Sequence, residues 1–229
     1  MSTLTKKRSI GRTLAYVGLF LTCLTPAAGG VYRGTTLIME WDWLPLMLRR
    51  RSDNLPLFIH VVGAMIFYVL AALQIVPGMR KRYPAWHRIA GRVAVPAGIA
   101  SAAAATWLTV AHPDVSGPIL YYGRLLFGPL WAACLVLGLL AIKRRDIPAH
   151  QNWMIRAFAI SMPAGTLVFI SAPFFLYFGT LELPQTLDES IQSGAWILHL
   201  AVAETWIRRK RIVLTPDPLL ERKQHEYCL

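Results

Sequence analysis

The chain has 229 residues, of which 55% are hydrophobic and 16% are charged. Soluble domains carry about 25% charged residues, so this composition excludes an ordinary soluble domain. Its 24 Lys and Arg against 12 Asp and Glu give a formal net charge of +12, but membrane-length apolar runs separate the basic clusters, which argues against a nucleic-acid-binding protein. Only three cysteines occur, far apart and without a CxxCH motif, which excludes a disulfide framework and covalent haem.

The apolar stretches predict an all-α integral membrane bundle of about six transmembrane helices. A bilayer core is crossed by about 20 mostly apolar residues per helix. In chain order, the predicted spans are 10–30, 55–78, 87–111, 119–142, 150–178 and 191–207, followed by a short tail at 208–229. We therefore expect residues 1–229 to form a single transmembrane helical domain.

The first stretch, 10–30, has two interpretations. Basic residues at 6–8 precede it and the small residues of 26–29 end it, as in a cleaved signal peptide. The stretch is longer than a usual signal core, and keeping it gives an even number of crossings. We expect it to be retained. The following connector, 37–48, is too broken to cross and suits the outer interface, because it places two tryptophans beside acidic residues.

Prolines separate and interrupt the later spans. Pro84, Pro113, Pro148 and Pro184 fall in the predicted connectors, where they act as helix breakers. Further prolines lie inside the spans, where neighbouring helices or water can satisfy the freed carbonyl groups and kinks are expected. These interior prolines are Pro96, Pro129, Pro163 and Pro173.

Basic residues gather at alternate ends of the predicted spans, and acidic residues gather at the opposite ends, where the only cations outside the spans are Arg33 and the triplet Arg49 to Arg51. The basic positions are Lys6, Lys7, Arg8, Arg12, Arg80, Lys81, Arg82, Arg88, Arg92, Lys143, Arg144, Arg145, Arg156, Arg208, Arg209, Lys210 and Arg211. Because cytoplasmic connectors carry the excess of Lys and Arg, both termini are predicted to be cytoplasmic. Topology then accounts for most of the positive charge.

Four histidines lie within or at the start of predicted spans, where an ionisable side chain is costly and marks a candidate site. His87 and His150 begin two spans at the predicted cytoplasmic face, whereas His60 and His199 lie nearer the outer face. Neutral imidazole nitrogens bind haem iron, and helical bundles hold cofactors between facing helices. The alternative is that these histidines sit at the wet interface or bond to a neighbouring carbonyl group.

Gln74 follows His60 by fourteen positions, which returns it to nearly the same helix face close to the opposite membrane surface. If the helices pack as a bundle, Gln74, His87 and His150 form an inner layer and His60 and His199 form an outer one. His112, beside Pro113, suits an outer loop.

The arginines near the inner layer suggest an anion site. In the HRxxGR run, Arg88 and Arg92 lie one turn apart, and Gly91 allows a close helix approach. With Arg80, these side chains suit a lipid headgroup, a haem propionate or an anionic solute near two helix N-termini. The alternative is that they are snorkelling anchors that fix helix depth.

The fifth and sixth spans add further polar residues to the predicted interior. His150, Trp153 and Met154 share one face of the fifth span, and Arg156 points about 120° away from His150. Glu204, the only carboxylate within a predicted span, precedes Arg208 by four residues, which favours a local ion pair.

These residues together resemble a known family. The run His60…Gly63…Gln74…Arg80…His87-Arg88…Gly91-Arg92, then His150…Trp153-Met154…Arg156 and Glu204, is similar to the bacterial multi-pass membrane family called domain of unknown function 2306. The resemblance covers Leu55 to Arg208 and implies a helical fold in the bacterial inner membrane, with these positions marked but no activity. It also implies Asn where this chain has His199, which argues against His199 as a general haem ligand.

A looser similarity is to transmembrane b-type cytochromes, whose helices supply histidines at two depths. Here Gln74 stands where a second histidine of the second span would be needed, so at most one ligand pair per layer remains. This similarity is an analogy at the level of the fold.

Three functions therefore stay open. The leading hypothesis is a redox-active membrane protein that binds haem b through His60, His87, His150 and His199, with Arg80, Arg88, Arg92 and Arg156 beside the propionates. A second is binding of an anionic lipid or small anionic solute at the cytoplasmic His/Arg cluster. A third is a structural accessory subunit. Gln74, Trp153 and Glu204 belong to the polar bundle interior in each case.

The sequence also limits the chemistry and the partners. No motif for hydrolysis or nucleotide binding occurs, which leaves electron transfer as the candidate enzyme chemistry. No metal other than haem iron is expected. The expected partners are membrane lipids and a redox partner or quinone, and no nucleic acid is expected.

Overall fold

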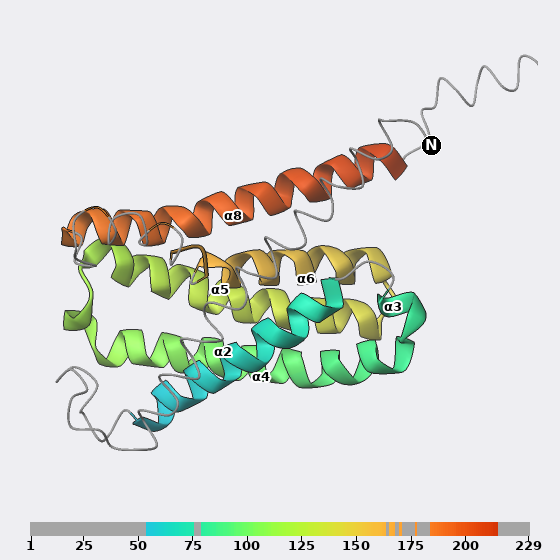
Figure 1. The fold of residues 1–229 in the computed structure, drawn as a ribbon, viewed down its shortest axis with the longest axis horizontal. Coiled ribbons are helices and arrows are strands. Elements are labelled where there is room, and N and C mark those ends of the chain that lie inside the picture. The colour runs from blue at the N-terminus through green and yellow to red at the C-terminus, as the bar shows by residue number, and fades with distance from the viewer. Residues whose placement is uncertain are drawn as a thin grey trace, which may run out of the picture.

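The computed structural model describes residues 54–75, 79–163 and 184–214, together with 165–167, 170 and 177. This part of the chain is helical and contains no strand, which confirms the predicted all-α class (Figure 1). Its helices are α2 (Asn54–Ile75), α3 (Met79–Arg82), α4 (Pro84–Ala111), the 3-10 helix η3 (Pro113–Val115), α5 (Pro118–Lys143), α6 (Ile147–Ser161) and α8 (Gln185–Leu214).

Among the described residues, three helices are long and apolar enough to cross a membrane, by length and composition. They are Leu55–Gln74, Pro84–Ala111 and Pro118–Lys143. These segments correspond to the second, third and fourth predicted spans. The predicted span 10–30, the connector 37–48 and the tail from 215 onward lie outside the described residues.

Prolines open several helices instead of standing outside them. Pro84 and Pro118 are the first residues of α4 and α5, and Pro148 is the second residue of α6. Proline suits the first turn, because its missing N–H has no helical acceptor there. The predictions that placed Pro84 and Pro148 in connectors were therefore wrong, and both helices begin three residues before the predicted starts at 87 and 150.

The interior prolines have two different outcomes. Pro96 and Pro129 lie within α4 and α5 as predicted. The helix α6 itself ends at Ser161, and Met162 forms a turn whose backbone is still helical. Pro163 and the described residues 165–167, 170 and 177 of the predicted span to 178 are helical again, whereas Pro173 lies outside the described residues.

Successive helices pack on one another in chain order. α4 lies on α2, α5 on α4 and α6 on α5, while α8 packs against both α5 and α6. Of these packed pairs, α2 and α4, α4 and α5, α5 and α6, and α6 and α8 run in opposite directions, whereas α8 runs parallel to α5 along one side of the bundle (Figure 1). The Tyr68 hydroxyl donates to the carbonyl oxygen of Ser161 and so joins α2 to α6. The core between these helices includes Phe67, Trp131 and Phe158.

A glycine allows α2 and α4 to approach closely. A methyl group built at Gly63 would lie 2.7 Å from the carbonyl oxygen of Ala97 and 3.0 Å from Cβ of Ser101. A larger residue at position 63 would therefore separate the two helices, as expected where small residues line a helix contact in a membrane.

Charge is divided between the two ends of the bundle. The helices α4 and α6 begin, and α5 ends, at the end of the bundle that contains α3 (Figure 1). We call it the basic end because exposed cations gather there. Its exposed cations are Arg80, Lys81, Arg82, Arg88, Arg92, Lys143, Arg144, Arg145, Arg208 and Arg209. The opposite, acidic end carries Asp114, Asp188 and Glu189. The bundle is therefore polarised along its length, as the charge pattern predicted.

Candidate functional site

His150 lies in the first turn of α6 with one imidazole nitrogen fixed. Its Nδ1 is 2.8 Å from the carbonyl oxygen of Gly138 on α5. A carbonyl oxygen only accepts hydrogen bonds, so Nδ1 donates, and a neutral ring keeps its lone pair on Nε2. Histidines that bind metals are commonly oriented in this way, by a bond from the second nitrogen to a carbonyl group.

His87 lies near His150 at the basic end. Its side chain is half-buried, and its Nδ1 is buried without a hydrogen-bond partner among the described residues. Both His150 and Arg80 are close enough to His87 to interact with it electrostatically. The structure thus brings the two histidines of the predicted inner layer to the same end of the bundle, together with one of the predicted arginines.

Gln74 belongs to the same layer. Its amide lies against Gly91 of α4, where an added methyl group would be 3.6 Å from Nε2 and 3.9 Å from Oε1. Gly91 therefore leaves room for this side chain one turn from His87. Arg88 and Arg92, on the same helix as Gly91, are exposed.

Gly138 connects the inner layer to the helix packing. Its carbonyl group orients His150, and the position of its missing side chain is filled by Met154 and Trp153 of α6. A methyl group at Gly138 would touch the thioether end of Met154 and lie 3.4 Å from Cβ of Trp153. The predicted face of His150, Trp153 and Met154 is thus the face of α6 that lies on α5.

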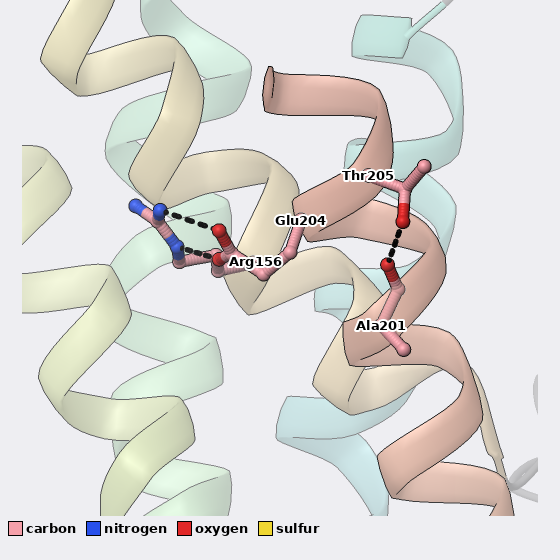
Figure 2. A network of polar contacts seen from close by, with 4 residues as sticks. All are labelled: Arg156, Ala201, Glu204 and Thr205. Atoms are coloured by element: carbon pink, nitrogen blue, oxygen red, sulfur yellow. Dashed lines mark hydrogen bonds and ion pairs between the residues drawn. The ribbon is translucent and has the colours of Figure 1, made fainter. Parts of the chain in front are cut away.

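Arg156 and Glu204 form an ion pair between α6 and α8 (Figure 2). Arg156 Nε donates to Oε1 of Glu204, and its Nη2 donates to Oε2 at 3.1 Å. The guanidinium also lies over the ring of Trp153, 4.7 Å from its centroid. The exposed fractions of the two charged side chains are 21% and 31%, so this bidentate pair is largely enclosed by protein.

This pair changes two sequence expectations. Arg156 was expected to bind an anion or propionate, but its guanidinium is occupied by a carboxylate of the protein. The local spacing assigned Glu204 to Arg208, whereas the structure gives it a bidentate partner 48 residues earlier. Helical spacing identifies neighbours on the same helix and carries no information about a second helix, which is why the pairing was missed.

His60 is held by Ser101 of α4 in the acidic half of the bundle. Ser101 Oγ donates its single proton to the His60 carbonyl oxygen at 2.8 Å. Nδ1 of His60 lies 3.1 Å from the Ser101 carbonyl oxygen and 3.0 Å from its hydroxyl oxygen. Both are then acceptors, so Nδ1 carries the ring proton and Nε2 keeps the lone pair in the neutral form.

His199 has hydrogen bonds at both ring nitrogens. Nδ1 lies 2.6 Å from the carbonyl oxygen of Ala195, and Nε2 lies 3.0 Å from Oγ1 of Thr166. Haem ligation by His199 would require Thr166 to be displaced. His60 and His199 thus belong to separate hydrogen-bonded groups, one between α2 and α4 and the other on the α8 side of the bundle.

Sequence reasoning missed three polar residues in the acidic half. Ser101 is fully buried, and Glu189 is only 4% exposed. The helix α8 begins at Gln185, before the predicted span 191–207, and therefore includes Glu189. Arg124 lies on the same side of α5 as the buried Phe127 and Trp131. Arg124 precedes Phe127 by three residues and Trp131 by seven, and this helical spacing could have shown from the sequence that all three share one face.

The side chains that could bind a metal ion do not cluster in the described residues. No group of three or more His, Cys, Asp or Glu side chains is placed to hold a metal ion within the ranges that the structure covers. Cys134 is a buried thiol within the core cluster.

Comparison with known proteins gives one family. A family model described as "Predicted membrane protein (DUF2306)" matches residues 57–207, which extend from α2 into α8. The match includes every polar residue of the two layers. The comparisons with curated proteins and with solved structures give no match.

Proposed function

The chain belongs to the DUF2306 family of predicted membrane proteins, and on that premise we propose that it is an inner-membrane protein that binds one haem b between His87 and His150. The basic end would face the cytoplasm, with six spans and both termini on the cytoplasmic side. The proposed function is electron transfer to or from a redox partner or a quinone.

The proposed orientation rests on the charge polarity of the bundle. Exposed cations surround the basic end, and described acidic residues such as Asp114 and Asp188 lie at the other. Positively charged connectors are retained on the cytoplasmic side during insertion. The count of six adds the stretch 10–30 and the segments around α6 and α8 to the three helices with membrane-spanning length and composition.

The observation that carries the haem proposal is the fixed orientation of His150. Its Nδ1–H is bound to Gly138, so its Nε2 lone pair remains for a metal. His87 supplies a second imidazole nearby, with a buried nitrogen that has no partner among the described residues. Haem iron held by protein ligands supplies one-electron transfer. Arg80 interacts electrostatically with His87 and would supply positive charge for a propionate.

One haem is favoured over the two-layer scheme. His199 already has both nitrogens bonded, and His60 lies with Ser101 in a different group. Arg156 is committed to Glu204 and is not assigned to a propionate. The proposed site therefore contains His87, His150, Arg80 and the adjacent Arg88 and Arg92.

The test is absorption spectroscopy of the full chain, produced with ample haem and purified in mild detergent. We expect a Soret band and sharp bands after dithionite reduction, with loss of the bound haem in His87→Ala and in His150→Ala. His199→Ala is the matched control and should keep the spectrum. A colourless wild-type protein, or unchanged spectra in both inner-layer variants, would refute the proposal.

A second candidate, binding of an anionic lipid or solute, is favoured by the exposed Arg88 and Arg92 one turn apart beside His87. We expect purified protein to retain anionic phospholipid in a salt-sensitive manner, less so in Arg88→Ala and Arg92→Ala, without any change in visible absorbance. Native mass spectrometry would measure the bound lipid. Equal lipid retention by wild type and both variants would contradict this candidate.

A further inference from the structure

Four helices each place a polar residue toward the interior in the acidic half of the bundle. They are His60 on α2, Ser101 on α4, Arg124 on α5 and Glu189 on α8. Ser101 and Glu189 are buried, and the other two are half-buried. Polar side chains at this depth in a membrane protein are costly unless they are hydrogen-bonded or hydrated.

Arg124 is the charged member of this group. It lies three residues from Phe127 and seven from Trp131, on the side of α5 that faces the core. It interacts electrostatically with His60, Asp188 and Glu189. However, within the described part of the chain it forms no hydrogen bond and no ion pair.

The nearby carboxylates have other partners. Gln192 Nε2 donates to Asp188 at 2.7 Å, and Gln185 Nε2 donates to Glu189 at 2.9 Å. Arginine cannot lose its proton in a protein and has five N–H donors. Charged groups that attract each other across a gap wider than a hydrogen bond are commonly bridged by water.

A second donor lies deeper along the same stripe of α5. Trp131 is only 7% exposed, and its Nε1 is buried with no acceptor among the described residues. Seven residues place it about 10 Å further along the helix from Arg124 and on nearly the same face. An indole N–H only donates, and lipid chains offer no acceptor, so Trp131 is the innermost donor of this stripe that still lacks a partner.

Aromatic side chains close the bundle at this depth. Phe67 packs edge-on against Trp131 with ring centroids 5.3 Å apart, and Phe127 is also buried. On the acidic side of these rings, His60 directs Nδ1 to Ser101 and keeps Nε2 for another partner. The polar groups thus end at an aromatic layer instead of continuing through the core.

We propose that water enters the bundle from its acidic end, passes Arg124, and reaches His60 in an inlet closed by the aromatic layer of Phe67, Phe127 and Trp131. The Nε2 lone pair of neutral His60 is then a proton acceptor in contact with solvent from that side. The inlet admits water and protons, and it is separate from the histidine pair at the basic end. It does not depend on haem binding.

Single-cysteine chains test this inlet by hydrophilic thiol labelling in open membrane fragments, which expose both faces. Cys23, Cys134 and Cys228 are replaced by Ala and Ser101→Cys is added; a matched chain keeps Cys134 alone. Ser101 is 0% and Cys134 is 1% exposed, so burial alone predicts equal reactivity. We expect a sulfonate methanethiosulfonate to label position 101 at least tenfold faster, and Arg124→Leu to remove most of the difference.

A second position keeps the test valid if Ser101→Cys disturbs folding. Gln192→Cys on α8 should also react with the hydrophilic reagent, whereas Ile197→Cys, on the exposed apolar face of the same helix, should react only with a lipid-soluble maleimide. Equal and slow hydrophilic labelling at positions 101, 134 and 192 would overturn the inlet. Labelling at 101 and 192 by the lipid-soluble reagent alone would also overturn it, because it would indicate lipid in place of water.

Discussion

At the scale of single residues, Gly138 has two roles that depend on each other. Its carbonyl group holds the ring of His150, and its lack of a side chain admits Met154 and Trp153. A histidine ligand is useful only if its ring is held in one orientation. The geometry of the proposed haem site therefore depends on a glycine that would not touch the cofactor.

Gly138→Ala should consequently disturb both packing and the site. The new methyl group would meet Met154, whose flexible end can move, so we expect a loss of about 1–3 kcal/mol in unfolding free energy, as is usual for overpacking. Bound haem should decrease with it. Denaturation in detergent and the Soret absorbance measure the two effects.

The control for this variant is Gly194→Ala on α8. No atom outside its own helical surroundings lies within 4 Å of a methyl group at position 194. Alanine is favoured over glycine within a helix, so we expect a gain of about 0.5–1 kcal/mol and an unchanged spectrum. Equal destabilisation by the two variants would contradict the role assigned to Gly138.

At the scale of helices, the pair Arg156–Glu204 ties α8 to α6. Both carboxylate oxygens of Glu204 accept from the guanidinium, which is also stacked on Trp153 (Figure 2). Trp153 in turn packs at Gly138. The ion pair is therefore linked through aromatic packing to the segment of α6 that carries His150.

Glu204→Ala should weaken the contact between α6 and α8. It would leave Arg156 partly enclosed without a counter-ion, and we expect a loss of about 1–3 kcal/mol, typical of a hydrogen bond to a charged group. Thermal unfolding in detergent measures the loss. The exchanged pair Arg156→Glu with Glu204→Arg should restore part of it.

Thr205→Ala is the matched control on the same helix. Thr205 is exposed, and its hydroxyl donates only within α8, to the Ala201 carbonyl oxygen at 2.8 Å (Figure 2). We expect a change of less than about 0.5 kcal/mol, as for most surface substitutions. An effect of Glu204→Ala no larger than this would show that the ion pair does not stabilise the helix contact.

The helices also show what the sequence could predict. The apolar runs located α2, α4 and α5 within a few residues, because lipid-facing helices must be apolar over a bilayer-length stretch. The start of α8 was missed, because adjacent acidic residues such as Asp188 and Glu189 are typical of a connector. Only the structure shows that Glu189 is buried against Gly117. Hydropathy describes the environment of a helix and does not identify its neighbours.

For the candidate site, the sequence supplied the residue types and the layer but only some of the contacts. His87, His150 and Gln74 were expected near one end, since alternate helices reverse direction, and they lie there. The bonds to Gly138 and Ser101 could not be foreseen, because a backbone carbonyl and a small serine carry no distinctive pattern.

At the scale of the molecule, the charge polarity predicts which end faces the cytoplasm. In cysteine-free chains, Asp114→Cys and Arg144→Cys place exposed thiols at the acidic and basic ends. We expect an impermeant thiol reagent to label position 114 in intact cells and position 144 only after the membrane is opened. The reverse labelling pattern would invert the proposed orientation.

The packing of each helix on its neighbour in the chain has a consequence for biogenesis. α2 with α4, and α5 with α6, are local partners, so each pair can associate soon after both members leave the ribosome, without waiting for distant sequence. The tie between Arg156 and Glu204 joins residues 48 positions apart and can form only after α8 is synthesised. Until then, Arg156 is an uncompensated cation, and a chain truncated before Glu204 should be a preferred substrate for membrane quality-control proteases.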